Sequence, residues 1–151
     1  MKRNAPAFRV ALLKILSALL LISCGQKQEA GAPSQPEQAS PEQDKGIGRV
    51  REIHLGPIDP ALAEKGKVIF TAKCSACHKL EGRYAGPPLG TVTKRRTPEF
   101  ILNMILNPSE MTQKDPVAQR LLAEYLTPMT PQNLSEDDAK AVLEYLRQAA
   151  Q

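Results

Sequence analysis

The chain of 151 residues has no tryptophan, three phenylalanines and three tyrosines, so few aromatic rings are available for stacking nucleic-acid bases. The net charge of +4 does not indicate a nucleic-acid partner either. Residues 1–23 hold four of the 20 basic side chains and no acidic one, which leaves 16 basic against 16 acidic residues beyond them. A mature protein without this segment is nearly neutral, and we expect no nucleic-acid partner.

Cysteine and histidine are scarce too, with three and two residues respectively. This count excludes a small scaffold held together by several disulfides. The length is that of one ordinary domain. The composition is uneven along the chain, because a basic and apolar start is followed by a polar, proline-rich stretch before the remainder.

Residues 1–23 have the parts of a secretory signal peptide, namely a basic start and an apolar run over residues 16–22. That run is shorter than the roughly 20 residues needed to span a bilayer, although an uncleaved membrane anchor is the alternative. The sequence L-I-S-C, which ends at Cys24, resembles a bacterial lipobox. The resemblance implies that Cys24 is lipidated and holds a periplasmic protein to a membrane. The residue after this cysteine is Gly25 and not Asp. By resemblance to bacterial lipoproteins, this favours attachment to the outer membrane over the inner membrane.

Residues 24–57 are expected to form the lipidated end and a tether. As far as about Lys45 the composition is Gln, Glu, Pro, Ser, Ala and Gly, with too little apolar surface to offset the conformational entropy of folding. This part is predicted to be disordered and stiffened by proline, as suits a spacer. Residues 46–58 are predicted to be an irregular lead-in, and the folded domain is assigned to residues 58–151.

The domain is predicted to be all-α, because helix-start signals recur while no useful stretch alternates with a period of two. A capping side chain before a proline is typical of a helix start. Residues 100–106 are apolar nearly all round and should be largely buried, and Gly66 permits a close helix crossing. About four short helices are expected, beginning at Asp59-Pro60, Thr97-Pro98, Asp115-Pro116 and Ser135, where Asp138 completes a capping box.

The strongest motif is C-S-A-C-H at residues 74–78, which is the attachment pattern of c-type haem. Two thiols at this spacing form thioethers with the two vinyl groups of the porphyrin, and the adjacent imidazole reaches the iron. The sequence therefore predicts one covalent haem c, with Cys74 and Cys77 as its attachment points and His78 as an iron ligand.

Two other interpretations of this motif fit less well. A dithiol for disulfide exchange would be expected in a βαβ context, which this sequence lacks. A zinc site needs further ligands, and only Cys24 and His54 are left to supply them, of which Cys24 is already accounted for as the lipid anchor.

With these residues in view, the sequence resembles the class I cytochromes c over about residues 60–149. The elements and their order carry the resemblance: Gly66 and Phe70 before C-S-A-C-H, then Gly86-Pro87-Pro88-Leu89, a methionine, and a last helix with Tyr145-Leu146. The resemblance implies the class I cytochrome c fold around one haem. It also implies that the carbonyl of Pro87 accepts a hydrogen bond from His78.

The sixth iron ligand has three methionine candidates. Met129 lies in T-P-M-T-P shortly before the last helix, which is where the family places its ligand, and the prolines restrict this loop. Met129 is therefore our choice, with Met111 as the alternative. Met104 lies mid-helix among apolar residues, where packing explains it. His54 would make a bis-histidine site, but a lone histidine before the first helix is typically solvated.

Ligation by histidine and methionine closes both axial positions, which leaves no site for a substrate. We therefore predict a monomeric carrier of single electrons in respiration, not an enzyme. The alternative is a haem enzyme or gas sensor with an open sixth position. Residues 107–134 also resemble small cytochromes that accompany respiratory reductases, which suggests a redox partner such as nitrous oxide reductase, or an oxidase.

The basic side chains are concentrated around the haem motif. Residues 61–97 hold eight basic and two acidic side chains, whereas residues 98–151 hold four and eight. A basic rim of this kind steers an acidic redox partner at low salt. The alternative is a solvated surface without a partner.

Overall fold

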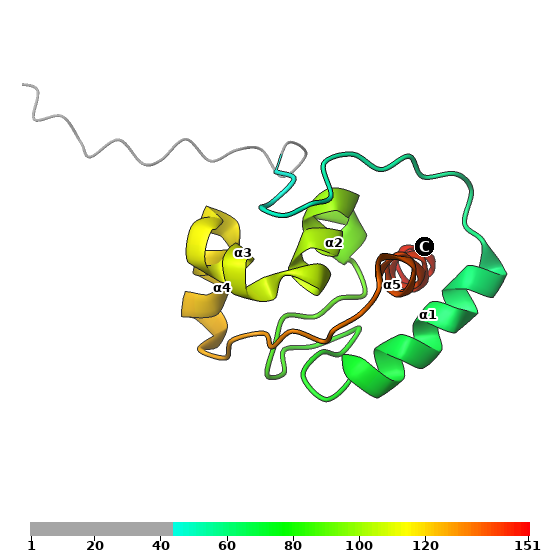
Figure 1. The fold of residues 1–151 in the computed structure, drawn as a ribbon. Coiled ribbons are helices and arrows are strands. Elements are labelled where there is room, and N and C mark those ends of the chain that lie inside the picture. Colours follow the sequence, from blue (N-terminus) through cyan, green and yellow to red (C-terminus); the bar gives the residue numbers. More distant parts are fainter. Residues whose placement is uncertain (1–43) are drawn as a thin grey trace, which may run out of the picture. The chain divides into compact units, whose positions relative to one another are not determined.

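The computed structural model describes residues 44–151. The predicted signal peptide, the lipid attachment at Cys24 and the tether up to residue 43 lie outside this part of the chain. Within it there are helices and no strand, which confirms the predicted all-α class (Figure 1). The elements are α1 (Pro60–Lys73), the 3₁₀ turn η1 (Val92–Lys94), α2 (Pro98–Leu106), α3 (Pro108–Lys114), α4 (Pro116–Tyr125) and α5 (Glu136–Ala149).

All four predicted helix starts are confirmed, and each has the expected side-chain cap. Asp59 and Asp115 each accept hydrogen bonds from two backbone N–H groups of the first turn, and Thr97 and Ser135 each accept one. Each cap satisfies N–H groups that have no partner within the helix, and is typically worth about 1 kcal/mol.

The expected number of about four helices is too low, because α3 was not predicted. None of the four expected helix starts lies at Asn107-Pro108. In the structure Asn107 is both the C-cap of α2 and the N-cap of α3, with Pro108 at the first helical position. A proline ends one helix through its effect on the preceding residue, and its fixed φ also suits the start of the next.

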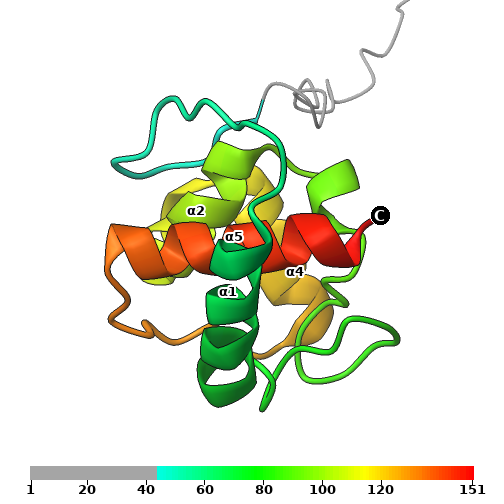
Figure 2. The same cartoon turned by 90° about the vertical axis from the view of Figure 1, so that its right-hand side faces the viewer.

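The crossing of α1 and α5 is the most extensive helix contact in the described domain, and Figure 2 shows α1 running across α5. Gly66 lies at this crossing. A Cβ atom there would overlap the backbone carbonyl of Ala141 and lie 3.0 Å from Cβ of Tyr145, so the predicted close approach is confirmed. One turn further along α1, the rings of Phe70 and Tyr145 pack with centroids 5.3 Å apart.

Helix α2 lies at the centre of the core. Its apolar residues are largely buried as predicted, and Leu102 is 1% exposed. One core cluster joins α1, α2 and α5 through Phe70, Ile101, Leu102, Ile105, Ala139, Val142, Leu143 and Leu146. A second cluster joins α2 to α3 and α4 through Phe100, Met111, Val117 and Ala118.

Residues 44–57, which we call the strap, have no helix but are held against the domain by buried polar side chains. Asn103 of α2 is 1% exposed, and its amide makes three hydrogen bonds to the strap backbone. The buried carboxylate of Glu99 accepts from the N–H of Ile53 at 3.3 Å. The packed part of the chain therefore begins before residue 58.

None of the helices between residues 44 and 151 has the length and apolar character needed to cross a membrane.

Candidate haem-binding site

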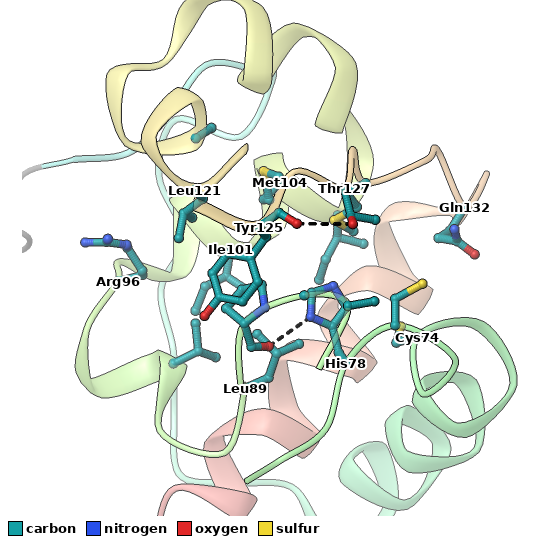
Figure 3. Close-up of a pocket in the computed structure, with 18 of the residues that line it drawn as sticks. Cys74, His78, Leu89, Arg96, Ile101, Met104, Leu121, Tyr125, Thr127 and Gln132 are labelled. Atoms are coloured by element: carbon teal, nitrogen blue, oxygen red, sulfur yellow. Dashed lines mark hydrogen bonds between the residues drawn. The ribbon is translucent and has the colours of Figure 1, made fainter. Parts of the chain in front are cut away.

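A cavity of about 370 Å³ lies between α2, the last turn of α4 and the loop that follows α1. This volume is in the range of roughly 300–1,000 Å³ that is usual for cofactor pockets. Most of its walls are apolar, and they include Phe70, Leu89, Ile101, Ile105, Leu121, Val142 and Leu146. Figure 3 shows Cys74 and His78 on one side of this cavity and Thr127, which leads into the T-P-M-T-P loop, on another.

The C-S-A-C-H motif continues directly from the end of α1. Cys74 is the C-cap of α1 and donates its N–H to the carbonyl of Phe70. Cys77 and His78 both donate their N–H groups to the carbonyl of Cys74, which extends the chain by one further turn. This turn brings Cys74, Cys77 and His78 to the cavity wall together, and the thiol of Cys77 is exposed at its rim.

The loop after His78 folds back on itself and returns the chain to the histidine. Gly86 donates its N–H to the carbonyl of Cys77 at 2.8 Å, and Leu89 donates to Lys79 at 2.9 Å. Pro87 is thereby placed beside the imidazole, and its carbonyl oxygen lies 3.0 Å from His78 Nδ1. The hydrogen bond implied by the family resemblance is present.

Gly86 is required at its position because the His78 ring lies against the backbone there. A Cβ atom on Gly86 would lie 2.7 Å from Nδ1 and 3.1 Å from Nε2 of the ring, closer than van der Waals contact permits. The imidazole is thus held between a flat backbone surface and the Pro87 carbonyl. Its Nε2 has no hydrogen-bond partner among residues 44–151 and is free for a metal.

The segment after α4 forms another wall of the cavity. Leu126 ends α4 in the left-handed conformation, with a φ of 53°, and turns the chain out of the helix. Thr127, Pro128 and Met129 follow in a segment without helix or strand, and all three line the cavity. The prediction placed Met129 in such a loop, and it lines the same cavity as His78.

Of the other two methionines, Met104 packs against the second core cluster, as expected from its place in the helix. Met111, the alternative ligand, is fully buried in the second core cluster, and its sulfur accepts a hydrogen bond from the N–H of Ile47 at 3.0 Å. It does not line the cavity, whereas Met104 does. His54 has a side chain that is 91% exposed and lies near Glu52, so it is solvated as expected.

Three cationic side chains at the cavity were not singled out from the sequence. Lys73, Arg95 and Arg96 line it, with Arg95 also donating to the carbonyl of Pro88 at 2.8 Å. The guanidinium of Arg96 packs over the ring of Phe100 at 5.5 Å. Cations beside an apolar cavity suit a ligand that is largely apolar and carries carboxylates, as haem does.

The thiol environment differs from that of a dithiol for disulfide exchange. Burial, and secondarily the neighbouring Cys77, raises the pKa of the Cys74 thiol, whereas exchange-active cysteines have a lowered pKa. Among residues 44–151 no group of three His, Cys, Asp or Glu side chains is placed to hold a zinc ion. The donor set that does occur is two thiols, one free imidazole nitrogen and the thioethers of Met104 and Met129 around an apolar cavity, which fits a covalently attached haem.

Comparison with protein families matches residues 63–150 to the family described as Cytochrome c. This range contains the motif, the cavity loop and Met129. A comparison with curated proteins finds no match.

Among solved structures, the chain is similar to a cytochrome c from Rhodothermus marinus. The two are 51% identical with a TM-score of 0.67, over 68% of this chain and 90% of the other. An engineered cytochrome c from the same organism, bound to a carbene intermediate, is 49% identical with a TM-score of 0.64 over the same shares of both chains. A second engineered form is 50% identical with a TM-score of 0.66, again over 68% and 90%.

Proposed function

Because this chain belongs to the cytochrome c family and so carries a covalent haem c, we propose that it transfers single electrons with His78 and Met129 as the iron ligands. Cys74 and Cys77 hold the porphyrin. The bound group supplies a reversible one-electron couple at its iron.

The observation that supports this assignment is that the two ligand residues line one cavity. His78 lies at its wall with Nε2 free, and Met129 enters from the segment after α4. Of the other thioethers, Met111 lies outside the cavity and accepts from the N–H of Ile47. Met104 lines the cavity but packs from the middle of α2 against the second core cluster. Met129 is therefore the better ligand candidate.

The protein's own residues perform three tasks in electron transfer. Pro87 and Gly86 fix the orientation and tautomer of the His78 ring, so that the ligand does not rearrange when the charge on the metal changes. The apolar walls exclude water, and low polarity around the metal raises its reduction potential. With His78 and Met129 both bound to it, the iron would have no coordination site left for a substrate, which favours a carrier over an enzyme.

The proposal is tested by a spectroelectrochemical titration of the holoprotein, followed by exposure of the reduced form to carbon monoxide. A carrier with a closed iron gives one reversible one-electron wave and does not bind carbon monoxide. A high-spin ferric spectrum, or ready binding of carbon monoxide by the reduced protein, would instead indicate an open sixth position and a haem enzyme or sensor.

We further propose that an acidic redox partner docks beside the C-S-A-C-H motif. Lys73 and Lys79 are exposed next to this motif, and neither has a carboxylate partner among residues 44–151. By contrast, Lys65 and Lys67 on α1 pair with Asp138 and Glu64. A respiratory reductase such as nitrous oxide reductase, or an oxidase, is the class of partner that the sequence suggests.

The proposed location is the periplasmic side of a membrane, with the outer membrane favoured. It rests on the sequence of residues 1–25 alone. Two or more acyl chains on Cys24 would bind a bilayer stably, since each buried methylene contributes about 0.8 kcal/mol. Replacing Cys24 with Ser should move the haem protein from the membrane fraction to the soluble periplasmic fraction, and retention in the membrane would contradict the anchor.

A further inference from the structure

Arg83 connects the two chain segments that carry the proposed iron ligands. It lies in the loop between His78 and Gly86, on the histidine side of the cavity. Its guanidinium reaches the last turn of α4, where Nη1 donates to Glu124 Oε1 at 2.9 Å and Nη2 donates to the backbone carbonyl of Glu124 at 2.7 Å. The same guanidinium packs over the ring of Tyr125, 4.2 Å from its centroid.

These contacts are the sole side-chain hydrogen bonds that join residues 74–91 to residues 116–134 in the described domain. Helix α4 packs against α3, and Val117 and Ala118 in its first turn join the core cluster that contains Phe100 of α2, so its packing is concentrated at its start. The end of α4 and the segment with Met129 are therefore joined to the loop after His78 mainly by Arg83 and by the bound group.

The chemistry of the contact suits a stabilising role. The backbone carbonyl of Glu124 belongs to the last turn of α4, where carbonyls lack helical partners and a cation is favoured by the helix dipole. The guanidinium satisfies this carbonyl, pairs with the Glu124 carboxylate and stacks on an aromatic ring, which a lysine could not do all at once. Tyr125 lines the cavity, and Met129 follows four residues later.

We propose that Arg83 is a positioning residue that holds the end of α4 against the His78 loop and so keeps Met129 on the iron. This inference rests on the proposed function, because it takes Met129 as a ligand. When the contact is lost, the segment after α4 moves away more readily, and an external ligand replaces the methionine more easily.

The test measures imidazole binding to the ferric holoprotein by loss of the band at about 695 nm that reports methionine on c-type haem iron. For Arg83→Gln the apparent affinity for imidazole should rise about three- to tenfold over wild type, the range expected for a partly exposed ion pair with ring stacking. Arg83→Lys, which keeps the charge, should give an intermediate value. Arg120→Gln is the matched control, because it removes an exposed arginine from α4, the helix that Arg83 contacts.

An imidazole affinity in Arg83→Gln equal to that in Arg120→Gln would overturn the role of Arg83. If Arg83→Gln does not accumulate as holoprotein, the test is made with Arg83→Lys instead. An imidazole affinity of Arg83→Lys equal to that of wild type then overturns the proposal. Absence of the band in wild type is a different failure, because it removes Met129 as ligand and with it the proposed function. Thermal unfolding followed by far-ultraviolet circular dichroism separates the local effect from a general loss of stability.

Discussion

The carbonyl oxygen of Pro87 lies 3.0 Å from Nδ1 of His78, so one nitrogen of the imidazole is used within the protein and Nε2 is left for the iron. The contact depends on the loop after His78, which returns through Gly86 to the backbone of Cys77. The orientation of the ligand is thus set by backbone atoms a few residues away in the sequence.

Gly86→Ala should impair the site. The added Cβ would press on the ring, 2.7 Å from His78 Nδ1, and overpacking of this kind typically costs about 1–3 kcal/mol. We expect a lower yield of holoprotein and a lower melting temperature. Gly56→Ala is the control, since nothing lies within 4 Å of a Cβ there. Equal yields and melting temperatures for the two variants would show that the ring is not held in this way.

Asn103→Ala should detach the strap. The substitution removes three hydrogen bonds to the backbone of Lys45 and Val50 and leaves these groups without partners. A loss of about 2–4 kcal/mol in the free energy of unfolding follows from typical hydrogen-bond values. Denaturant unfolding measures it, and faster proteolytic cleavage within residues 44–57 should accompany it. The exposed Gln148→Ala on α5 should change stability by less than about 0.5 kcal/mol. A similarly small effect at Asn103 would mean that the strap is not bound through this amide.

Asp115→Asn should stabilise the protein increasingly as the pH rises. Burial raises the pKa of the Asp115 carboxyl, and the neighbouring Asp44 raises it further, so its contribution to stability is present at low pH and lost as the pH rises through the folded-state pKa. Asparagine caps the helix equally well and carries no charge. It could also donate to Asp44 Oδ2, which is buried without a partner among the described residues.

The melting temperature of Asp115→Asn relative to wild type should therefore increase from about pH 4, near the ordinary carboxyl pKa, toward neutrality. Asp138→Asn is a control of opposite sign. A hydrogen bond from Lys65, followed by one from Ser135, lowers the pKa of the Asp138 carboxyl. Its contribution is present at neutral pH and lost on acidification, so this variant should be less stable than wild type at neutral pH and approach it in acid. A pH-independent difference for Asp115→Asn would contradict the assignment.

Lys73→Gln should slow electron transfer to an anionic oxidant. Lys73 is exposed at the cavity, whereas Lys67 on the same helix lies 3.6 Å from Glu64 and is partly neutralised. At low ionic strength, we expect the rate constant for oxidation of the reduced protein by ferricyanide to fall about twofold in Lys73→Gln. It should fall by less in Lys67→Gln. The difference should vanish at high salt, where exposed charges are screened. Equal rates at low salt would argue against a docking surface here.

The local signals in this sequence were the most informative ones. Helix starts at Asp59, Thr97, Asp115 and Ser135 depend on one side chain and its own first turn, and all four are present. The haem c attachment motif is equally local. Helix α3 is not predicted because a proline such as Pro108 is typical both of the end of one helix and of the start of the next. The sequence alone does not show that both occur here.

Contacts between distant residues could not be predicted in the same way. The roles of Met111 and Met104 depend on which side of their helices faces the cavity. Nothing near Met111 in the sequence indicates that Ile47, 64 residues earlier, donates to its sulfur. Arg83 was counted as part of a basic rim, but it pairs with Glu124, 41 residues later. Likewise, the partners of the buried Asn103 amide lie in the strap, which is distant in the sequence.

The most direct test of the account is the absorption spectrum of the ferric holoprotein in a series of methionine variants. Wild type should show the band at about 695 nm that is typical of methionine bound to c-type haem iron, and Met129→Ala should lose it. Met111→Leu and Met104→Leu should retain the band, because both side chains pack at the second core cluster, where leucine fills a similar volume. Survival of the band in Met129→Ala, or its absence from wild type, would contradict ligation by Met129 and the closed iron on which the electron-carrier function depends.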